Sequence, residues 1–174
     1  MACDTLIGIA KDCLNSFGGI DTVLIADREG LDTITVTSGE ITALALETPA
    51  TWQKFHFARN SGNFTEAMTT DVTTGSNTYT QTITFNLARR EVNKRNALML
   101  LGAGQRDLMF LVKDNNGNWW LFGYNEDLER GLQMTGLDGG SGSAGTELNG
   151  YTPTFSGELK EMAYAVDSSI IPTL

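Results

Sequence analysis

The segment from Asp107 to Gly123, DLMFLVKDNNGNWWLFG, constrains the fold more than any other part of this chain. Two apolar runs, Leu108–Val112 and Trp119–Phe122, flank a polar stretch that contains asparagine and glycine. Because these two residue types tolerate the positive φ of a tight turn, the segment is predicted to form a β-hairpin. Its strands are apolar at nearly every position, which predicts burial on both faces, inside a sandwich or against a neighbouring subunit.

The neighbouring indoles of Trp119 and Trp120 are expected to point to opposite faces of their strand. Two interpretations follow from this arrangement. Both rings are ordinary core aromatics, or one fills the core while the other faces a partner, a ligand or a second layer.

A second hairpin is predicted over residues 63–87, where side chains alternate strictly between two faces. Nine of the twenty residues from Thr65 to Thr84 are threonine, which gives one face that is polar but uncharged. The apolar face carries Tyr79, Gln81, Ile83, Phe85 and Leu87, and the polar face carries Thr78, Thr80, Thr82, Thr84 and Asn86. Strands of about ten residues are unusually long, so the hairpin is predicted to project from the body. The alternative is an ordinary solvated sheet face.

The rest of the chain predicts a single domain over residues 1–174 that is mainly β. Shorter strands are expected at residues 20–26, 33–37, 41–46, 51–59 and 151–166, the last as one strand or two. One helix is predicted from Arg89 to Leu101, with Arg89, Arg90, Lys94 and Arg95 on its outer side. Residues 1–17 are expected to form an arm or a short helix, and residues 167–174 an apolar tail. The expected architecture is a β-sandwich or barrel with one flanking helix and a long protruding hairpin.

The charge and the apolar runs exclude several classes of protein. The formal net charge is −9, whereas gripping nucleic acid through its phosphates requires clustered lysine and arginine. No apolar run approaches the length of a membrane-spanning helix, and the N-terminus lacks the features of a signal peptide. The chain is therefore expected to be made in the cytoplasm, without a membrane partner. Cys3 and Cys13 are expected to be reduced and buried, unless the segment between them turns back to form a bridge.

Catalytic and metal-binding patterns are missing from the sequence. The only histidine, His56, lies within a strand pattern and has no nucleophile or metal motif beside it. The glycine-rich segment at 137–145 lacks the lysine and the helix of a phosphate loop. We therefore predict no enzyme, no cofactor and no metal; a hydrolase using two of the many acidic residues is kept only as a formal third class.

A carbohydrate-binding or adhesin-like β-sandwich is the alternative function. Aromatic rings that could stack on sugars are supplied by Trp52, Trp119, Trp120, Tyr124 and Tyr151. Most of these residues lie in apolar strands, however, where packing in the core explains them equally well.

The order of motifs resembles a known family. It runs from two N-terminal cysteines and Gly18-Gly19-Ile20 through the threonine-rich hairpin and a helix to KDNNGNWWLFG at 113–123. A glycine-rich loop and ELNGYTPTFSGELKEMAYAV at 147–166 follow. In this layout the chain is similar to virion structural proteins of tailed bacteriophages that infect Bacteroidetes, of the tail-tube or tail-ring type.

The resemblance implies a non-enzymatic protein of the virion tail. Its copies would form rings that stack into a conduit, contact other virion tail proteins, and let DNA pass without specific binding. Two segments are the expected assembly contacts: the hairpin tip Thr73, Thr74, Gly75, Ser76 and Asn77, and the loop residues Gly139, Gly140, Ser141, Gly142 and Gly145.

Overall fold

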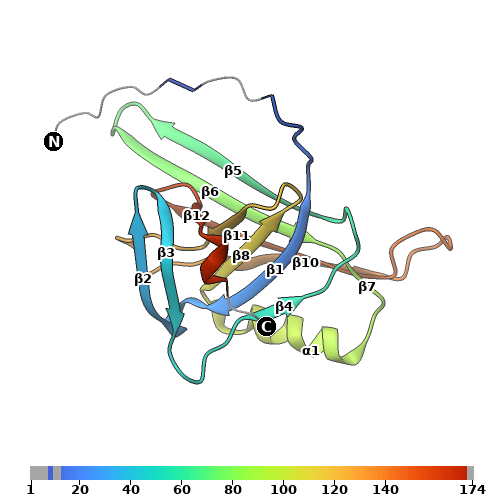
Figure 1. Cartoon of the computed structure of the whole chain (residues 1–174). Helices are drawn as coiled ribbons and strands as arrows, with labels where there is room; N and C mark the ends of the chain where they lie inside the picture. The colour runs from blue at the N-terminus through green and yellow to red at the C-terminus, as the bar shows by residue number, and fades with distance from the viewer. Residues whose placement is uncertain (1–7, 10–12, 172–174) are drawn as a thin grey trace.

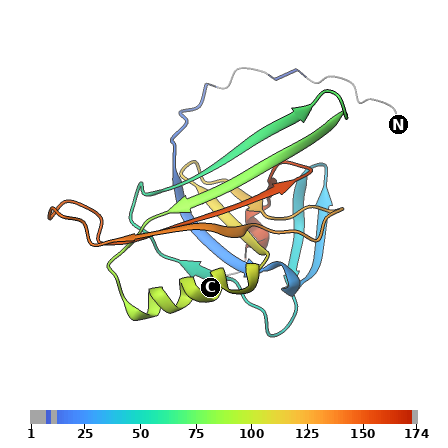
Figure 2. The ribbon, with the colours of Figure 1, turned by 180° about the vertical axis from the view of Figure 1, so that it is seen from behind.

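The computed structural model describes residues 8–9 and 13–171 as a sandwich of two β-sheets with one flanking α-helix (Figures 1 and 2). The seven-stranded sheet has the strand order β2-β3-β12-β9-β8-β1-β4. The five-stranded sheet has the order β10-β11-β6-β5, with β7 also paired to β11. The predicted class, mainly β with one flanking helix, is confirmed, and the sandwich is the form that it takes.

The strand bounds are as follows. The seven-stranded sheet contains β1 (Ile20–Asp27), β2 (Leu31–Thr37), β3 (Glu40–Leu46), β4 (Gln53–Phe55), β8 (Leu108–Asp114), β9 (Trp119–Phe122) and β12 (Tyr164–Val166). The five-stranded sheet contains β5 (Gly62–Asp71), β6 (Ser76–Phe85), β7 (Leu87–Ala88), β10 (Gln133–Gly140) and β11 (Gly150–Leu159). The helix is α1 (Val92–Gly102), and short 3-10 turns cover Arg28–Gly30, Ala103–Gln105 and Ser168–Ile170.

The β8–β9 hairpin lies in the middle of the larger sheet, between β1 and β12. The side chain of Phe110 faces the core between the two sheets, and that of Leu111 faces a second core on the opposite side of the larger sheet. Both are fully buried, so the predicted two-sided burial is confirmed. Trp120 packs against the first core and Trp119 against the second, which confirms that their rings point to opposite faces. Both indoles therefore serve this chain's own packing.

Aromatic rings join the two sheets across the first core. Phe155 of β11 stacks on Phe85 of β6 with centroids 6.0 Å apart, and meets Phe110 of β8 at 4.8 Å. All three rings are fully buried. Such contacts combine apolar burial with favourable ring geometry, so Phe155 links the smaller sheet to the larger one.

Gln81 is the one fully buried polar side chain on the core face of β6. Its Oε1 accepts a hydrogen bond from Gly123 N at 3.0 Å, and its Nε2 donates to Glu66 Oε1 and Glu161 O, each at 3.4 Å. The amide thus ties β6 to the end of β9 and to the loop before β12. Its partners explain how a polar residue fits the alternation of Tyr79, Ile83 and Phe85 without a buried unpaired group.

The helix begins later than the sequence predicted. Arg89 has a φ of +64°, a left-handed conformation that helical residues do not adopt, so α1 starts at Val92. Arg89 and Arg90 consequently lie before the helix and not on its outer side. Lys94 is on the helix, where its Nζ donates to Ala88 O at 2.6 Å, and the Arg90 guanidinium lies over the Tyr151 ring.

Two further expectations need correction. The strand expected at residues 51–59 is only three residues long, because its ladder with β1 ends where Phe55 pairs with Val23; the Phe55 and Phe57 rings both pack beside Phe85. Cys13 is exposed and unbridged, not buried, because it stands on an arm that leaves the body before β1. Residues 8–9 and 13–17 of this arm are without helix or strand, and the expectation for Cys3 lies outside the described residues.

The C-terminal segment lies against the protein's own second core. Ile170 and Ile171 pack against the cluster that contains Ile41, Leu111 and Val166. The apolar residues of the predicted tail therefore pack on their own chain, up to Ile171, the last described residue.

Candidate functional site

The hairpin tip Thr73–Asn77 lies at the free end of β5 and β6 (Figure 1). Asp71 holds it: its Oδ1 accepts from Thr73 N at 2.8 Å, and its carbonyl accepts from Gly75 N at 2.8 Å. Gly75 has a φ of +69°, which explains a glycine at this position. Along β6, the ladder with β11 reaches only to Tyr79, so within the described chain the residues nearer the tip pair with β5 alone.

The second predicted contact segment is divided between a strand and a loop. Gly139 and Gly140 belong to β10, where they pair with Tyr151 and Gly150. The sequence predicted both glycines in the loop. They lie in the strand because a residue without a side chain lets β10 pack closely on β11: a Cβ on Gly139 would approach the Tyr151 ring to 3.1 Å. The loop proper covers residues 141–149 and extends away from both sheets (Figures 1 and 2).

Glu147 orders this loop. Its carboxylate accepts hydrogen bonds from Ser143 N, from Ser143 Oγ at 3.0 Å and from Ala144 N at 3.3 Å. The bonds from Ser143 and Ala144 favour the ionised form, so the pKa of Glu147 is lowered from its ordinary value of 4.5.

Acidification should release the loop. The pKa of Glu147 is lower in the folded state than its ordinary value. The stabilisation that its ionised carboxylate gives the loop is therefore complete above the ordinary pKa and is lost as pH falls through the lowered pKa. In a pH series of NMR spectra, we expect the amide protons of Ser143 and Ala144 to titrate together below pH 4.5. Glu147→Gln should move both resonances to random-coil chemical shifts at every pH. Glu129→Gln, on another loop, should leave them unchanged. Titration at or above the ordinary pKa would contradict the assignment.

The hairpin tip and the loop lie at opposite ends of the smaller sheet. β6 begins beside the end of β11, where Leu159 pairs with Tyr79. β11 begins beside β7, where Gly150 pairs with Ala88 just after the loop. Two segments that the sequence suggested as assembly contacts are therefore not one surface but the two ends of one sheet (Figure 1).

The outer face of the smaller sheet carries hydroxyl groups and acidic groups. Thr82 and Ser156 hydrogen-bond across β6 and β11 at 3.0 Å, and Thr84 and Thr154 at 3.4 Å. The strands β5, β6, β10 and β11 contain no lysine or arginine, while Asp138 and Glu158 supply carboxylates at register positions that alternate with core residues. The threonine periodicity predicted this polar face, although its continuation onto β11 was not foreseen.

Sequence reasoning missed the two open edges of this sheet. Among the described residues, β5 pairs only with β6, and β10 pairs only with β11. Exposed edges are often protected by lysine, by proline or by a bulge; neither strand contains lysine or proline, and the register of β10 shifts only near its start, between Met134 and Gly136. Each edge instead exposes a large apolar side chain, Met68 of β5 at 60 % and Leu137 of β10 at 44 %. The two side chains occupy the core-side register, opposite Tyr79 and Pro153.

The described ranges contain no candidate metal centre. No group of three or more histidine, cysteine, aspartate or glutamate side chains gathers there as for a metal ion. His56 is exposed beside α1. No helix in the described part of the chain is long and apolar enough to cross a bilayer.

The aromatic residues considered for sugar binding do not share an open face. Tyr151 and Trp120 pack in the first core, whereas Trp52, Tyr124 and Trp119 pack in the second. Trp120 also uses its Nε1 to donate to Asp114 within the β8–β9 hairpin, at 3.3 Å. This distribution favours packing roles for all five.

Comparison of the chain with protein-family models, with curated protein sequences and with solved structures gave no significant match.

Proposed function

We propose that this protein is a non-enzymatic structural subunit that assembles into rings through the open edges of its smaller sheet. The supporting observation is the strand order β10-β11-β6-β5, in which every neighbouring pair is antiparallel. With four strands of alternating direction, β5 of one copy and β10 of the next run antiparallel after rotation about a ring axis. The same junction can then repeat until the ring closes, leaving the smaller sheets without a free edge.

The ring would place the polar face of this sheet around a central channel. That face combines threonine and serine hydroxyls with the carboxylates of Asp138 and Glu158, and its strands contain no cationic side chain. Because phosphates bind to clustered lysine and arginine, such a wall holds no anchoring points for DNA. These properties suit a conduit through which DNA slides without being bound.

The resemblance to tail-tube and tail-ring proteins of bacteriophages agrees with this proposal. In that setting the protein would belong to the virion tail, its rings would stack on one another, and other tail proteins would meet the ends of the stack. Elements that project along the stack are then needed, and the hairpin tip and the loop at residues 141–149 supply one at each end of the sheet.

The direct test is light scattering on the size-exclusion peak of the purified protein, with negative-stain images of the same fraction. Closed rings or tubes with a central hole are the expected result. Irregular aggregates, or open filaments without a hole, would contradict the proposed β5–β10 junction.

Deleting Thr73–Asn77 should separate ring formation from stacking. Thr69 pairs with Thr78, so the shortened hairpin can close through Thr70, Asp71 and Val72 without disturbing the ladder with β11. We expect an unchanged unfolding midpoint and single rings that no longer stack, seen by negative stain. Tube formation equal to that of the unaltered chain would overturn the role given to this tip.

A further inference from the structure

A groove of about 650 Å³ separates helix α1 from the end of β1 and from the edge strand β4. Its wall is mainly apolar and includes Ile25, Phe55, Leu87, Ala97, Leu100 and Leu101. Leu100 is 61 % exposed although its side chain borders this groove. Beside it, β4 pairs only with β1 among the described strands, so one row of its backbone groups is open to a further strand.

The N-terminal arm carries apolar side chains that its own body leaves in solvent. Ile9 is 98 % exposed and Phe17 is 56 % exposed, and the described arm residues have no strand or helix. An extended apolar segment of this kind is suited to an apolar groove beside an open strand, since it can add backbone hydrogen bonds and bury side chains together.

The direction in which the arm leaves the body is fixed. The side-chain amide of Asn116 accepts from Phe17 N at 2.8 Å and donates to Phe17 O at 3.1 Å, as a neighbouring strand would. Asn115 Nδ2 donates to Gly18 O at 2.6 Å, and Asn115 N donates to Gly19 O. The β8–β9 turn therefore holds the base of the arm at the start of β1.

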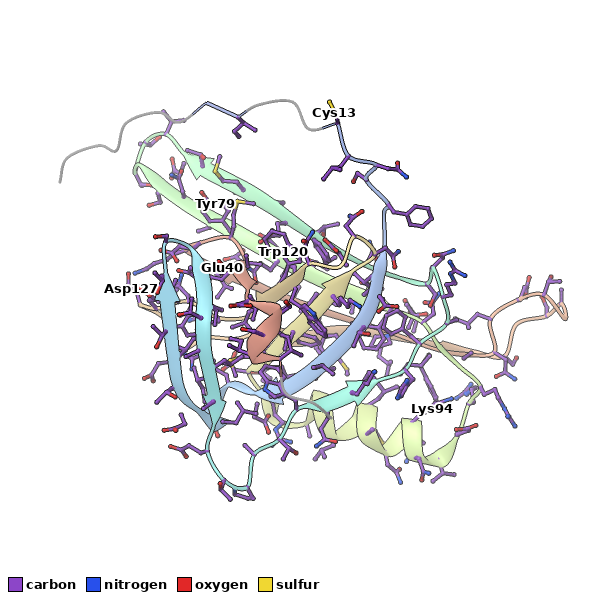
Figure 3. All side chains as sticks on the ribbon, in the orientation of Figure 1. Cys13, Glu40, Tyr79, Lys94, Trp120 and Asp127 are labelled. Atoms are coloured by element: carbon purple, nitrogen blue, oxygen red, sulfur yellow. The ribbon has the colours of Figure 1, made fainter. Side chains whose placement is uncertain are left out.

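The arm and the groove lie at opposite ends of β1. The arm joins the strand at Ile20, whereas the groove is lined by Ile25, Ala26 and Asp27. Seven residue steps of about 3.3 Å separate these ends by about 23 Å. Figure 3 shows the separation, with Cys13 on the arm at one side of the molecule and Lys94, which lines the groove, at the other. The arm leaves the body pointing away from its own groove.

We propose that the arm of one copy binds in the groove between α1 and β4 of a second copy. The contact is head-to-tail, so it repeats from copy to copy instead of closing a pair. The inference rests on the proposed function for the way in which copies meet, because stacked rings bring the arm of one subunit to the far end of another. The groove then receives Ile9 and its neighbours, and β4 gains a strand on its open edge.

A peptide of residues 1–17, labelled with fluorescein and kept reduced, tests the contact without rings. The acceptor is the full chain carrying Ile9→Asp, which disables its own arm, and binding is followed by fluorescence anisotropy. We expect saturable binding. Adding Leu100→Asp to this acceptor should weaken the binding at least about tenfold, since it places a charge in the groove. Met99→Asp is the matched control: Met99 is adjacent and 56 % exposed but does not line the groove.

The outcomes are separable from those of the ring assay. Saturable binding that depends on Leu100 but not on Met99 supports the arm contact. Absence of saturable binding, or equal binding by all three acceptors, overturns it even if the unaltered chain forms rings. Conversely, failure of the unaltered chain to form closed rings refutes the proposed function and leaves the peptide result to decide the arm contact.

Discussion

Leu137→Lys should abolish ring formation and leave the subunit folded. Leu137 lies on the open edge of β10, and its 44 % exposure shows that the monomer can tolerate a longer polar side chain there. In the proposed ring the same position is covered by β5 of the next copy. A lysine would lose its solvation in that junction, and the Glu66 carboxylate of β5 is already engaged by Gln81 Nε2 and Ala163 N.

Met68→Lys on the opposite edge should give the same result, because one junction uses both edges. Size-exclusion light scattering is expected to show monomers for either variant and closed rings for the unaltered chain. Met162→Lys provides the control: Met162 is also an exposed apolar residue, at 55 %, but lies outside β5 and β10. Rings formed equally by all three variants would exclude these edges as the junction.

Phe155→Ala should cause the largest loss of stability. The ring is fully buried and contacts Phe85 of its own sheet and Phe110 of the other. Removing a buried phenylalanine side chain typically costs about 3–5 kcal/mol. The free energy of unfolding of a whole domain is only about 5–15 kcal/mol, so this is a large part of it. For a chain of this length the melting temperature should fall by on the order of 10 °C.

Thermal and urea unfolding followed by circular dichroism would measure the loss. Phe17→Ala is the comparison, since it removes the same side chain from an exposed site on the arm and should shift the midpoint by less than about 2 °C. An equal shift for both variants would mean that Phe155 does not join the sheets.

The parts of the fold that the sequence predicted are those governed by local pattern. Strict alternation placed Ile83 and Phe85 on one face and Thr82 and Thr84 on the other, and the apolar runs around Asn115 identified a hairpin buried on both sides. Such patterns follow from the two-residue period of a strand, which holds wherever that strand lies.

The parts that it did not predict depend on pairing between distant residues. Nothing near Tyr79 in the chain shows that β11 stops pairing there, and nothing near Leu137 shows that β10 is an edge. Asn116 holds Phe17, and Asn115 holds Gly18 and Gly19, so these contacts also join residues almost one hundred positions apart. Asparagine is common in turns, so its presence in this hairpin gave no sign that the same side chains also hold the base of the arm.

The position of β11 in the smaller sheet determines when a newly made chain could first join other copies. β6 lies between β5, its immediate neighbour in sequence, and β11, which begins at Gly150. Since a polypeptide emerges from its N-terminus, the hairpin is complete long before the strand that joins it to β10. The two edges of that sheet therefore exist together only after β11 has been made. In the proposed ring, a nascent chain that does not yet include β11 would lack one half of the junction, so only chains synthesised past Leu159 could join the assembly.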